Sequence, residues 1–176
     1  TFDSRRASAI GRREQQIGSD GRLVVDVDGT TLKVGLLEKL LVPALAKLTN
    51  FVPDGGIWPN TQRPEWNDAN NALAGPGLSM VTLYHLHRYL RFVSSQLAGA
   101  HTESVALTNS VAAGFREILD VLERSPSPIE PIDDHARRSI VDALGTAGAE
   151  HRQRVGQGSD QTRLDVSIAD MRRLCE

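Results

Sequence analysis

The chain has 176 residues, of which 40% are hydrophobic, and a formal net charge of −2. This length fits one domain with a real core, and a net charge near zero gives no electrostatic basis for binding nucleic acid or an anionic membrane. The longest hydrophobic runs are broken by His, Arg or Pro, so we expect no transmembrane helix, and no signal peptide is visible. The one cysteine, Cys175, cannot form an internal disulfide, which agrees with a reducing compartment, and we expect the cytoplasm.

Residues 1–34 are predicted to form a lead-in segment followed by a β-hairpin. Residues 1–20 are charged and weakly periodic, which is typical of an extended segment or a short helix. The stretch 22–34 alternates hydrophobic and polar residues around Asp28-Gly29. An Asp-Gly pair between two β-prone runs favours a two-residue type I′ turn, because both central residues of that turn need positive φ.

The remaining residues, 35–176, are predicted to form a helical domain. Hydrophobic residues recur with a helical period in five stretches, and Pro43 predicts a kink or a helix start in the first of them. Asp133 and Asp134 suit the N-terminus of the fourth helix. The expected fold class is therefore all-α, built from antiparallel helix pairs, with one β-hairpin near 22–34. The hydrophobic positions are Leu37, Leu40, Leu41, Ala44, Leu45 and Leu48 in the first helix, 78–98 in the second, Val111, Phe115, Ile118, Leu119 and Leu122 in the third, Ala136, Ile140, Leu144 and Ala147 in the fourth, and Leu164, Ile168 and Met171 in the fifth.

A long polar segment, 51–77, separates the first two predicted helices. Compact domains seldom keep unstructured loops longer than about 12–15 residues unless the loop functions or is disordered. Both tryptophans of the chain, Trp58 and Trp66, lie in this segment, whereas disordered segments are poor in aromatic residues. The composition favours an ordered loop, although a loop whose Asn and Asp side chains only cap helices and close turns would share it.

The stretch 63–70, Arg-Pro-Glu-Trp-Asn-Asp-Ala-Asn, carries the side chains of a sugar-binding site. An indole ring stacks on the CH face of a sugar, while Asn, Asp and Arg groups pair with its hydroxyls. Cleavage of a glycosidic bond also needs a carboxylic acid that protonates the leaving oxygen. The candidate catalytic residues are therefore Asp68 and Glu65, and the candidate substrate-binding residues are Trp58, Arg63, Trp66, Asn67 and Asn70.

The tripeptide Trp66-Asn67-Asp68 resembles part of the Asp-Trp-Asn-Asp-Gly catalytic loop of glycoside phosphorylases of the cellobiose phosphorylase type. Glu65 stands where that family usually has Asp, and the Gly that ends the family motif is replaced. The resemblance implies that Asp68 is the general acid and that Trp66 lines a sugar subsite.

The same resemblance implies an (α/α)6 barrel, a fold shared by the six-hairpin glycosidases of the amylo-α-1,6-glucosidase type. Such a barrel needs more helices than the five predicted here, so residues 35–176 would be an incomplete catalytic barrel that packs against helices of a longer parent chain. The implied substrate is an oligosaccharide or glucoside. The implied reaction needs no metal or organic cofactor, and inorganic phosphate is the co-substrate if the enzyme is a phosphorylase.

Two other functions fit parts of the sequence. The run ending in Asp26-Val27-Asp28 resembles the nucleophile motif of haloacid-dehalogenase-like phosphatases, in which Asp26 would be phosphorylated and Asp28 would be the acid/base. That fold needs several parallel strands, and no second apolar, β-branched run follows. The other alternative is a non-catalytic helical interaction module. The histidines do not suggest a metal site, because His85 and His87, two positions apart, diverge on a helix.

Overall fold

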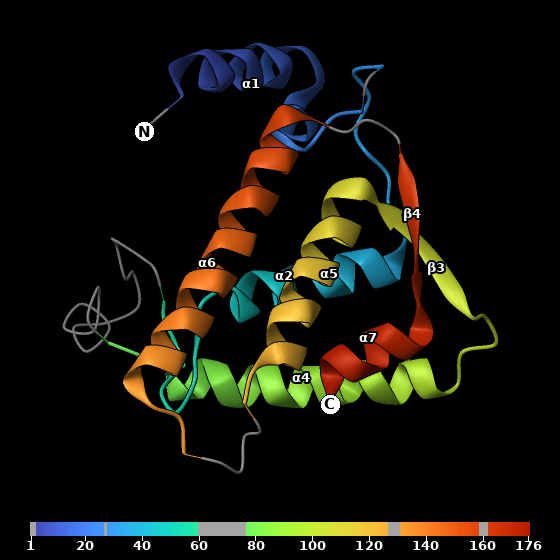
Figure 1. Cartoon of the computed structure of the whole chain (residues 1–176). Helices are drawn as coiled ribbons and strands as arrows, with labels where there is room; N and C mark the ends of the chain where they lie inside the picture. The colour runs from blue at the N-terminus through green and yellow to red at the C-terminus, as the bar shows by residue number, and fades with distance from the viewer. Residues whose placement is uncertain (1–2, 27, 60–76, 127–130, 159–161) are drawn as a thin grey trace.

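The computed structural model describes residues 3–26, 28–59, 77–126, 131–158 and 162–176 (Figure 1). The described chain is mostly helical, with two small antiparallel sheets. In chain order the elements are α1 (Ser4–Ile17), the 3-10 helix η1 (Gly18–Arg22), α2 (Leu36–Leu48), β1 (Phe51–Val52), β2 (Gly56–Ile57), α4 (Met80–Ala98), β3 (Ser104–Thr108), α5 (Asn109–Arg124), α6 (Asp134–Gln157), β4 (Arg163–Ser167) and α7 (Ile168–Cys175).

The core is built around α5, which contacts α6, α2 and α7. Its hydrophobic stripe is buried, and Phe115 is fully inaccessible to solvent. Leu144 of α6 and Met171 of α7 are equally buried. Burial of a large hydrophobic side chain stabilises a fold by roughly 1.5–3 kcal/mol, so these contacts hold the helices together. The predicted periodicity of the third and fourth helices is thus confirmed.

The β3–β4 pair corrects the all-α expectation. Its register runs from Ser104 opposite Ser167 to Thr108 opposite Arg163, and each strand leads directly into a helix. Leu164 therefore lies in a strand, and the predicted fifth helix begins only at Ile168. The spacing of its hydrophobic residues fits a helix, but pairing with a distant strand decides the backbone conformation.

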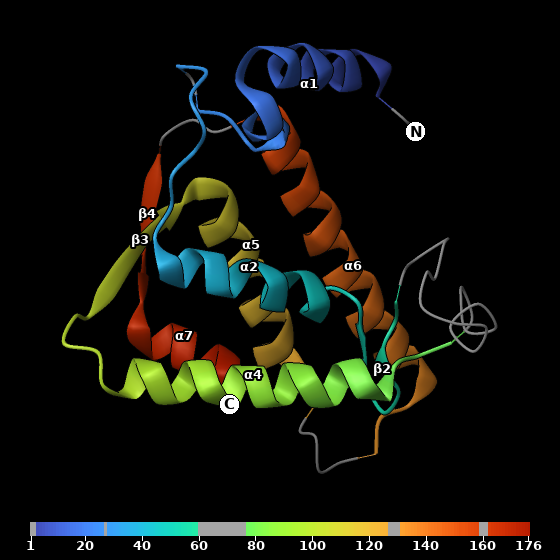
Figure 2. The same ribbon diagram turned by 180° about the vertical axis from the view of Figure 1, so that it is seen from behind.

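Helix α2 continues through Pro43, so the predicted helix start at that residue is wrong. The helix begins at Leu36, and a proline within it removes one backbone donor. Tyr89 of α4 donates its hydroxyl to the carbonyl of Leu40 at 2.8 Å, which ties α4 to α2. Figure 2 shows these two helices on the same face of the molecule.

The predicted hairpin is present but its turn differs. Val25 pairs with Thr31 in an antiparallel bridge. Asp26 N–H donates to the Thr30 carbonyl at 2.8 Å, so the bonded residues are four positions apart, one more than a two-residue turn allows. Gly29 adopts a positive φ of 81°, as expected for a longer loop that ends in a left-handed residue. The lead-in is the helix α1, which has no buried residue.

Candidate functional site

The residues that flank the segment carrying the Trp-Asn-Asp motif lie side by side, one strand of chain before it and one after it. Ile57 N–H donates to the Ser79 carbonyl at 3.2 Å, and Ser79 N–H donates to the Ile57 carbonyl at 2.7 Å. Trp58 N–H donates to the Asn50 carbonyl at 2.9 Å. We call Ile57, Trp58 and Ser79 the neck of the segment. Because both of its sides are hydrogen-bonded, the chain that enters 60–76 is held beside the chain that leaves it.

The β1–β2 hairpin places the first side of the neck at the end of α2. Its turn consists of Pro53, Asp54 and Gly55, and Asp54 adopts a positive φ of 58°, a conformation that Asp tolerates better than most residues. Gly56 has a φ of 145°, and a Cβ there would approach the Ser79 carbonyl to 3.2 Å. Glycine is therefore needed where the two sides of the neck meet.

Arg137, in the first turns of α6, fixes this hairpin from outside. Its Nε donates to the Pro53 carbonyl at 3.2 Å, and its Nη2 donates to the Asp54 carboxylate at 3.3 Å. The guanidinium also contacts Asp134, and its side chain is 29% exposed. On the other side of the neck, Ser79 caps α4 by accepting from the N–H of Thr82. The neck is thus held by the ends of three helices, α2, α4 and α6.

The structure places one of the predicted site residues. Trp58 lies at the neck with 39% of its surface exposed, where an indole is accessible to a ligand. The other predicted site residues lie outside the described residues, so their mutual geometry stays a prediction; they are Arg63, Glu65, Trp66, Asn67, Asp68 and Asn70.

A cavity of about 440 Å³ opens at the opposite end of α2, and we call it the Glu38 cavity. Figure 2 shows the elements that meet there: the segment after η1, the start of α2, the junction of β3 with α5, and the end of α6. The lining residues are Leu23, Val24, Thr31, Leu32, Val34, Glu38, Lys39, Val42, Thr108, Ser110, Val111, His151, Val155 and Gly158.

The polar groups of this cavity converge on the carboxylate of Glu38, which is 2% exposed. Thr108 donates its backbone N–H to Glu38 Oε2 at 3.2 Å and its hydroxyl to Oε1 at 2.5 Å. Arg163 Nη1 lies 3.7 Å from Oε2, a long ion pair. A buried carboxylate needs such partners, because an unpaired buried charge is costly. Glu38 thus joins α2 to the junction of β3 with α5.

His151 has a defined tautomer at the edge of the same cavity. Its Nδ1 lies 3.0 Å from the carbonyl oxygen of Ser110, and a carbonyl only accepts, so Nδ1 carries a proton. In the neutral ring Nε2 is then an acceptor. The contact at Nδ1 is a carbonyl rather than the Glu38 carboxylate, so Ser110, His151 and Glu38 do not form a catalytic triad.

Sequence reasoning missed Glu38, although a signal for it exists. Glu38 precedes Leu41, Leu45 and Leu48 at helical spacing, so this charged residue lies on the hydrophobic stripe of α2. A charged side chain on a buried face needs a partner. That partner, Thr108, is distant in sequence, which is why local patterns do not reveal it.

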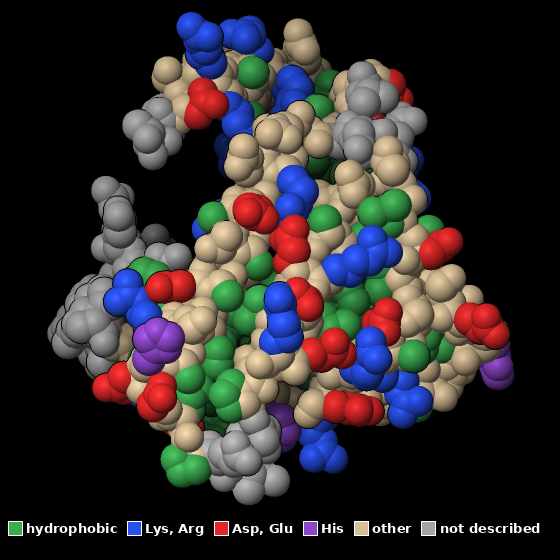
Figure 3. Space-filling view, viewed as in Figure 1, with side chains coloured by type: hydrophobic (Ala, Val, Ile, Leu, Met, Phe, Trp, Pro, Cys, Tyr) green, Lys and Arg blue, Asp and Glu red, His purple; other side chains and the backbone are tan. Residues whose placement is uncertain are grey.

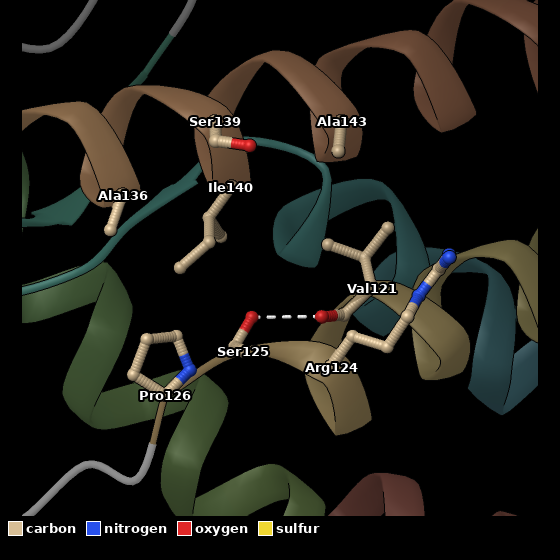
Figure 4. Close-up of a pocket in the computed structure, with 8 residues that line it drawn as sticks. All are labelled: Val121, Arg124, Ser125, Pro126, Ala136, Ser139, Ile140 and Ala143. Atoms are coloured by element: carbon tan, nitrogen blue, oxygen red, sulfur yellow. Dashed lines mark hydrogen bonds between the residues drawn. The ribbon is translucent and has the colours of Figure 1, made fainter.

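A second hollow lies between the end of α5 and the first half of α6. Hydrophobic side chains gather along this furrow in Figure 3. Its volume is about 380 Å³. On the α6 side it is lined by small side chains, those of Ala136, Ser139 and Ala143. Figure 4 shows Ile140 pointing into it and the Ser125 hydroxyl bonded to the carbonyl of Val121 at 2.8 Å. We call it the α5–α6 groove.

The structure shifts the pKa of Asp28, a residue of the phosphatase-like motif, and that of Cys175. The pKa of Asp28 is lowered because its carboxylate accepts from the backbone N–H and then the hydroxyl of Thr30. Burial raises the pKa of the Cys175 thiol to about 11. Within the described ranges, no group of three or more His, Cys, Asp or Glu side chains is arranged to hold a metal. In the described part of the chain, no helix combines the length and apolar character needed to cross a membrane.

Comparison of the sequence with protein-family models and with curated proteins gives no match.

Proposed function

We propose that this chain is part of a carbohydrate-active enzyme that cleaves glycosidic bonds, with Asp68 as the general acid. Two observations together support the proposal. The sequence contains Glu65-Trp66-Asn67-Asp68, and a hydrogen-bonded neck holds the two sides of this segment together between α2 and α4. Active-site loops in helical barrels join paired helices in the same way, as the resemblance to the cellobiose phosphorylase type implies. In this proposal the described helices are part of an (α/α)6 barrel.

The proposed reaction assigns a role to each motif residue. Asp68 donates a proton to the leaving oxygen, and Glu65 is a nearby carboxylate that raises the pKa of Asp68 by like-charge repulsion. Trp66 stacks on a sugar ring, and Trp58 extends this surface at the neck. The remaining substrate-binding residues pair with hydroxyls, and they are Arg63, Asn67 and Asn70. Phosphate or water attacks the anomeric carbon, and no metal or organic cofactor is required.

The test is substitution of the proposed acid in the full-length protein that contains this chain. Asp68→Asn should lower kcat on unactivated glucosides by roughly 10²–10⁴, the usual worth of general acid catalysis. The loss should be much smaller on aryl glucosides with an acidic phenol, because such a leaving group needs little protonation. Asp142→Asn, on the exposed face of α6, is the matched control and should leave both rates unchanged. An equal loss on both substrates, or no loss, would contradict the assignment.

A second measurement separates binding from chemistry. Trp66→Ala should raise KM for the sugar more than it lowers kcat, because a stacking contact is present in both the ground state and the transition state. A drop in kcat with KM unchanged would contradict a stacking role for Trp66.

The interaction-module alternative is favoured by the outer face of α4. Val81, Tyr84 and Phe92 are more than half exposed there, with 67%, 63% and 52% of their surfaces accessible. Exposed apolar surface of this kind marks an interface, and in the barrel proposal it is the face that packs against helices of the parent chain. If this face is exposed, the dye ANS should bind it, and binding should fall when Tyr84 and Phe92 are replaced by Ser. That result, together with no binding of glucosides by the full-length protein, would favour the interaction module over the enzyme.

The phosphatase alternative gains no support from the backbone. All strand pairs among the described residues are antiparallel, whereas that fold needs a parallel sheet.

A further inference from the structure

We propose that the Glu38 cavity binds a small neutral molecule with an aliphatic body and a hydroxyl group. This proposal does not depend on the glycosidic reaction, since the cavity lies at the end of α2 opposite the neck. A volume of about 440 Å³ falls within the range of small-molecule sites in proteins. Three parts of the chain that are distant in sequence line it, within 23–42, 108–111 and 151–158, so its shape depends on the fold.

The walls of the cavity select an aliphatic body. Half of the lining side chains are branched aliphatic groups, and the described lining contains no Phe, Tyr or Trp on which a sugar or a nucleobase could stack. Removal of aliphatic surface from water favours binding in proportion to the area buried. The aliphatic lining residues are Leu23, Val24, Leu32, Val34, Val42, Val111 and Val155.

The polar end of the cavity offers acceptors. An ionised carboxylate has about four lone-pair sites, and Thr108 supplies two donors to Glu38. Arg163 lies 3.7 Å away, beyond hydrogen-bond distance. The imidazole of His151, whose Nδ1 lies against the Ser110 carbonyl, also lines this end. A ligand that enters this end must therefore bring a donor.

The charges around the cavity select a neutral donor. Glu38 would attract a ligand ammonium that Arg163 and Lys39 repel, and the reverse holds for a ligand carboxylate, so neither charge gains enough to offset its lost hydration. A hydroxyl avoids both. It can donate to Glu38 and accept from the hydroxyl of Ser110, which lies 3.5 Å from that of Thr108. An alcohol thus matches the charged and hydrogen-bonding groups of the cavity better than an amine or an acid of equal length.

The experiment is a titration of the ¹⁵N-labelled chain with 1-hexanol, hexylamine and hexanoate, followed by NMR. With 1-hexanol we expect the amide signals of Glu38, Ser110 and His151 to shift along one saturating curve. Binding of hexylamine and of hexanoate should be weaker by about fivefold or more, because each carries a charge that loses its hydration in the cavity and meets a charge of like sign there. Tighter binding of either charged molecule, or no saturable shift with 1-hexanol, would overturn the proposal.

Three variants locate the binding. Val155→Phe fills the cavity and should abolish the saturable shift, whereas Ala143→Phe fills the α5–α6 groove and should leave it unchanged. Glu38→Gln should weaken 1-hexanol binding about tenfold, since a hydrogen bond to a charged acceptor becomes one to a neutral acceptor. If circular dichroism shows that Glu38→Gln is unfolded, the comparison of Val155→Phe with Ala143→Phe decides. Undiminished binding by folded Val155→Phe would refute the cavity as the site.

Discussion

The hydrogen bond between Thr108 and Glu38 should contribute measurably to stability. We consider Thr108→Val, which replaces the hydroxyl by a methyl group of similar size and keeps a β-branched side chain at the end of β3. The change opens no cavity and retains the backbone N–H that donates to Glu38 Oε2. It removes one donor, the hydroxyl that contacts Oε1. Most of any loss of stability therefore reports on that bond, because the other contact of the hydroxyl, with Ser110 Oγ, is long at 3.5 Å.

The expected loss follows from burial and charge. Glu38 is 2% exposed and Thr108 is 6% exposed, so water cannot readily replace the missing donor. A hydrogen bond to a charged group contributes about 1.5–3 kcal/mol. We expect the free energy of unfolding to fall by about 2 kcal/mol. In the Glu38→Gln background the same substitution should cost only about 1 kcal/mol, because the acceptor is then neutral, which gives a coupling of about 1 kcal/mol.

Urea denaturation followed by far-UV circular dichroism measures these changes. For an m-value of about 2 kcal/mol/M, Thr108→Val should lower the midpoint by about 1 M and leave m unchanged. Thr146→Val is the matched control, because its hydroxyl donates to a carbonyl on the exposed face of α6; such a surface change should alter stability by less than about 0.5 kcal/mol. Equal losses of stability in Thr108→Val and Thr146→Val would refute the role of the Glu38 carboxylate. Additive losses when Thr108→Val is combined with Glu38→Gln would refute it as well.

Two further predictions concern α6 and the hairpin. Gly148→Ala should destabilise the fold by about 1–3 kcal/mol, because its Cβ would lie 2.8 Å from Cβ of Thr49. Gly145→Ala in the same helix meets nothing within 4 Å and should stabilise the fold by about 0.5–1 kcal/mol. Thermal unfolding that ranks the two variants the other way would contradict the close approach of α6 to Thr49, the C-cap of α2. The lowered pKa of Asp28 means that the contribution of its turn to stability is present above the ordinary pKa of 3.8 and is lost as pH falls through the folded value. Thr30→Val should raise the pKa of Asp28 toward 3.8 in an NMR titration, and an unchanged pKa would show that the hydroxyl has no part in the shift.

The sequence determines the features that depend on neighbouring residues. Helix α5 follows from its stripe at Val111, Phe115 and Ile118, because a helix places residues three and four apart on one face. Helix α6 begins where its acidic residues predict, with Asp133 accepting from the N–H of Ala136. The Asp28-Gly29 pair predicts a turn, although the added loop residue depends on how the flanking chains align. The roles of Glu65, Trp66 and Asp68 remain predictions from the motif.

Only the tertiary structure decides the features that join distant segments. Leu164 follows a helical spacing with Ile168, yet it lies in β4, because its backbone bonds to β3 across a long separation in sequence. The position of Glu38 on the hydrophobic stripe of α2 can be read from the sequence, but its partner is decided only when the β3–α5 junction brings Thr108 against it. Strand pairing and the partners of buried charges are non-local interactions, so their energies are absent from any local pattern of residues.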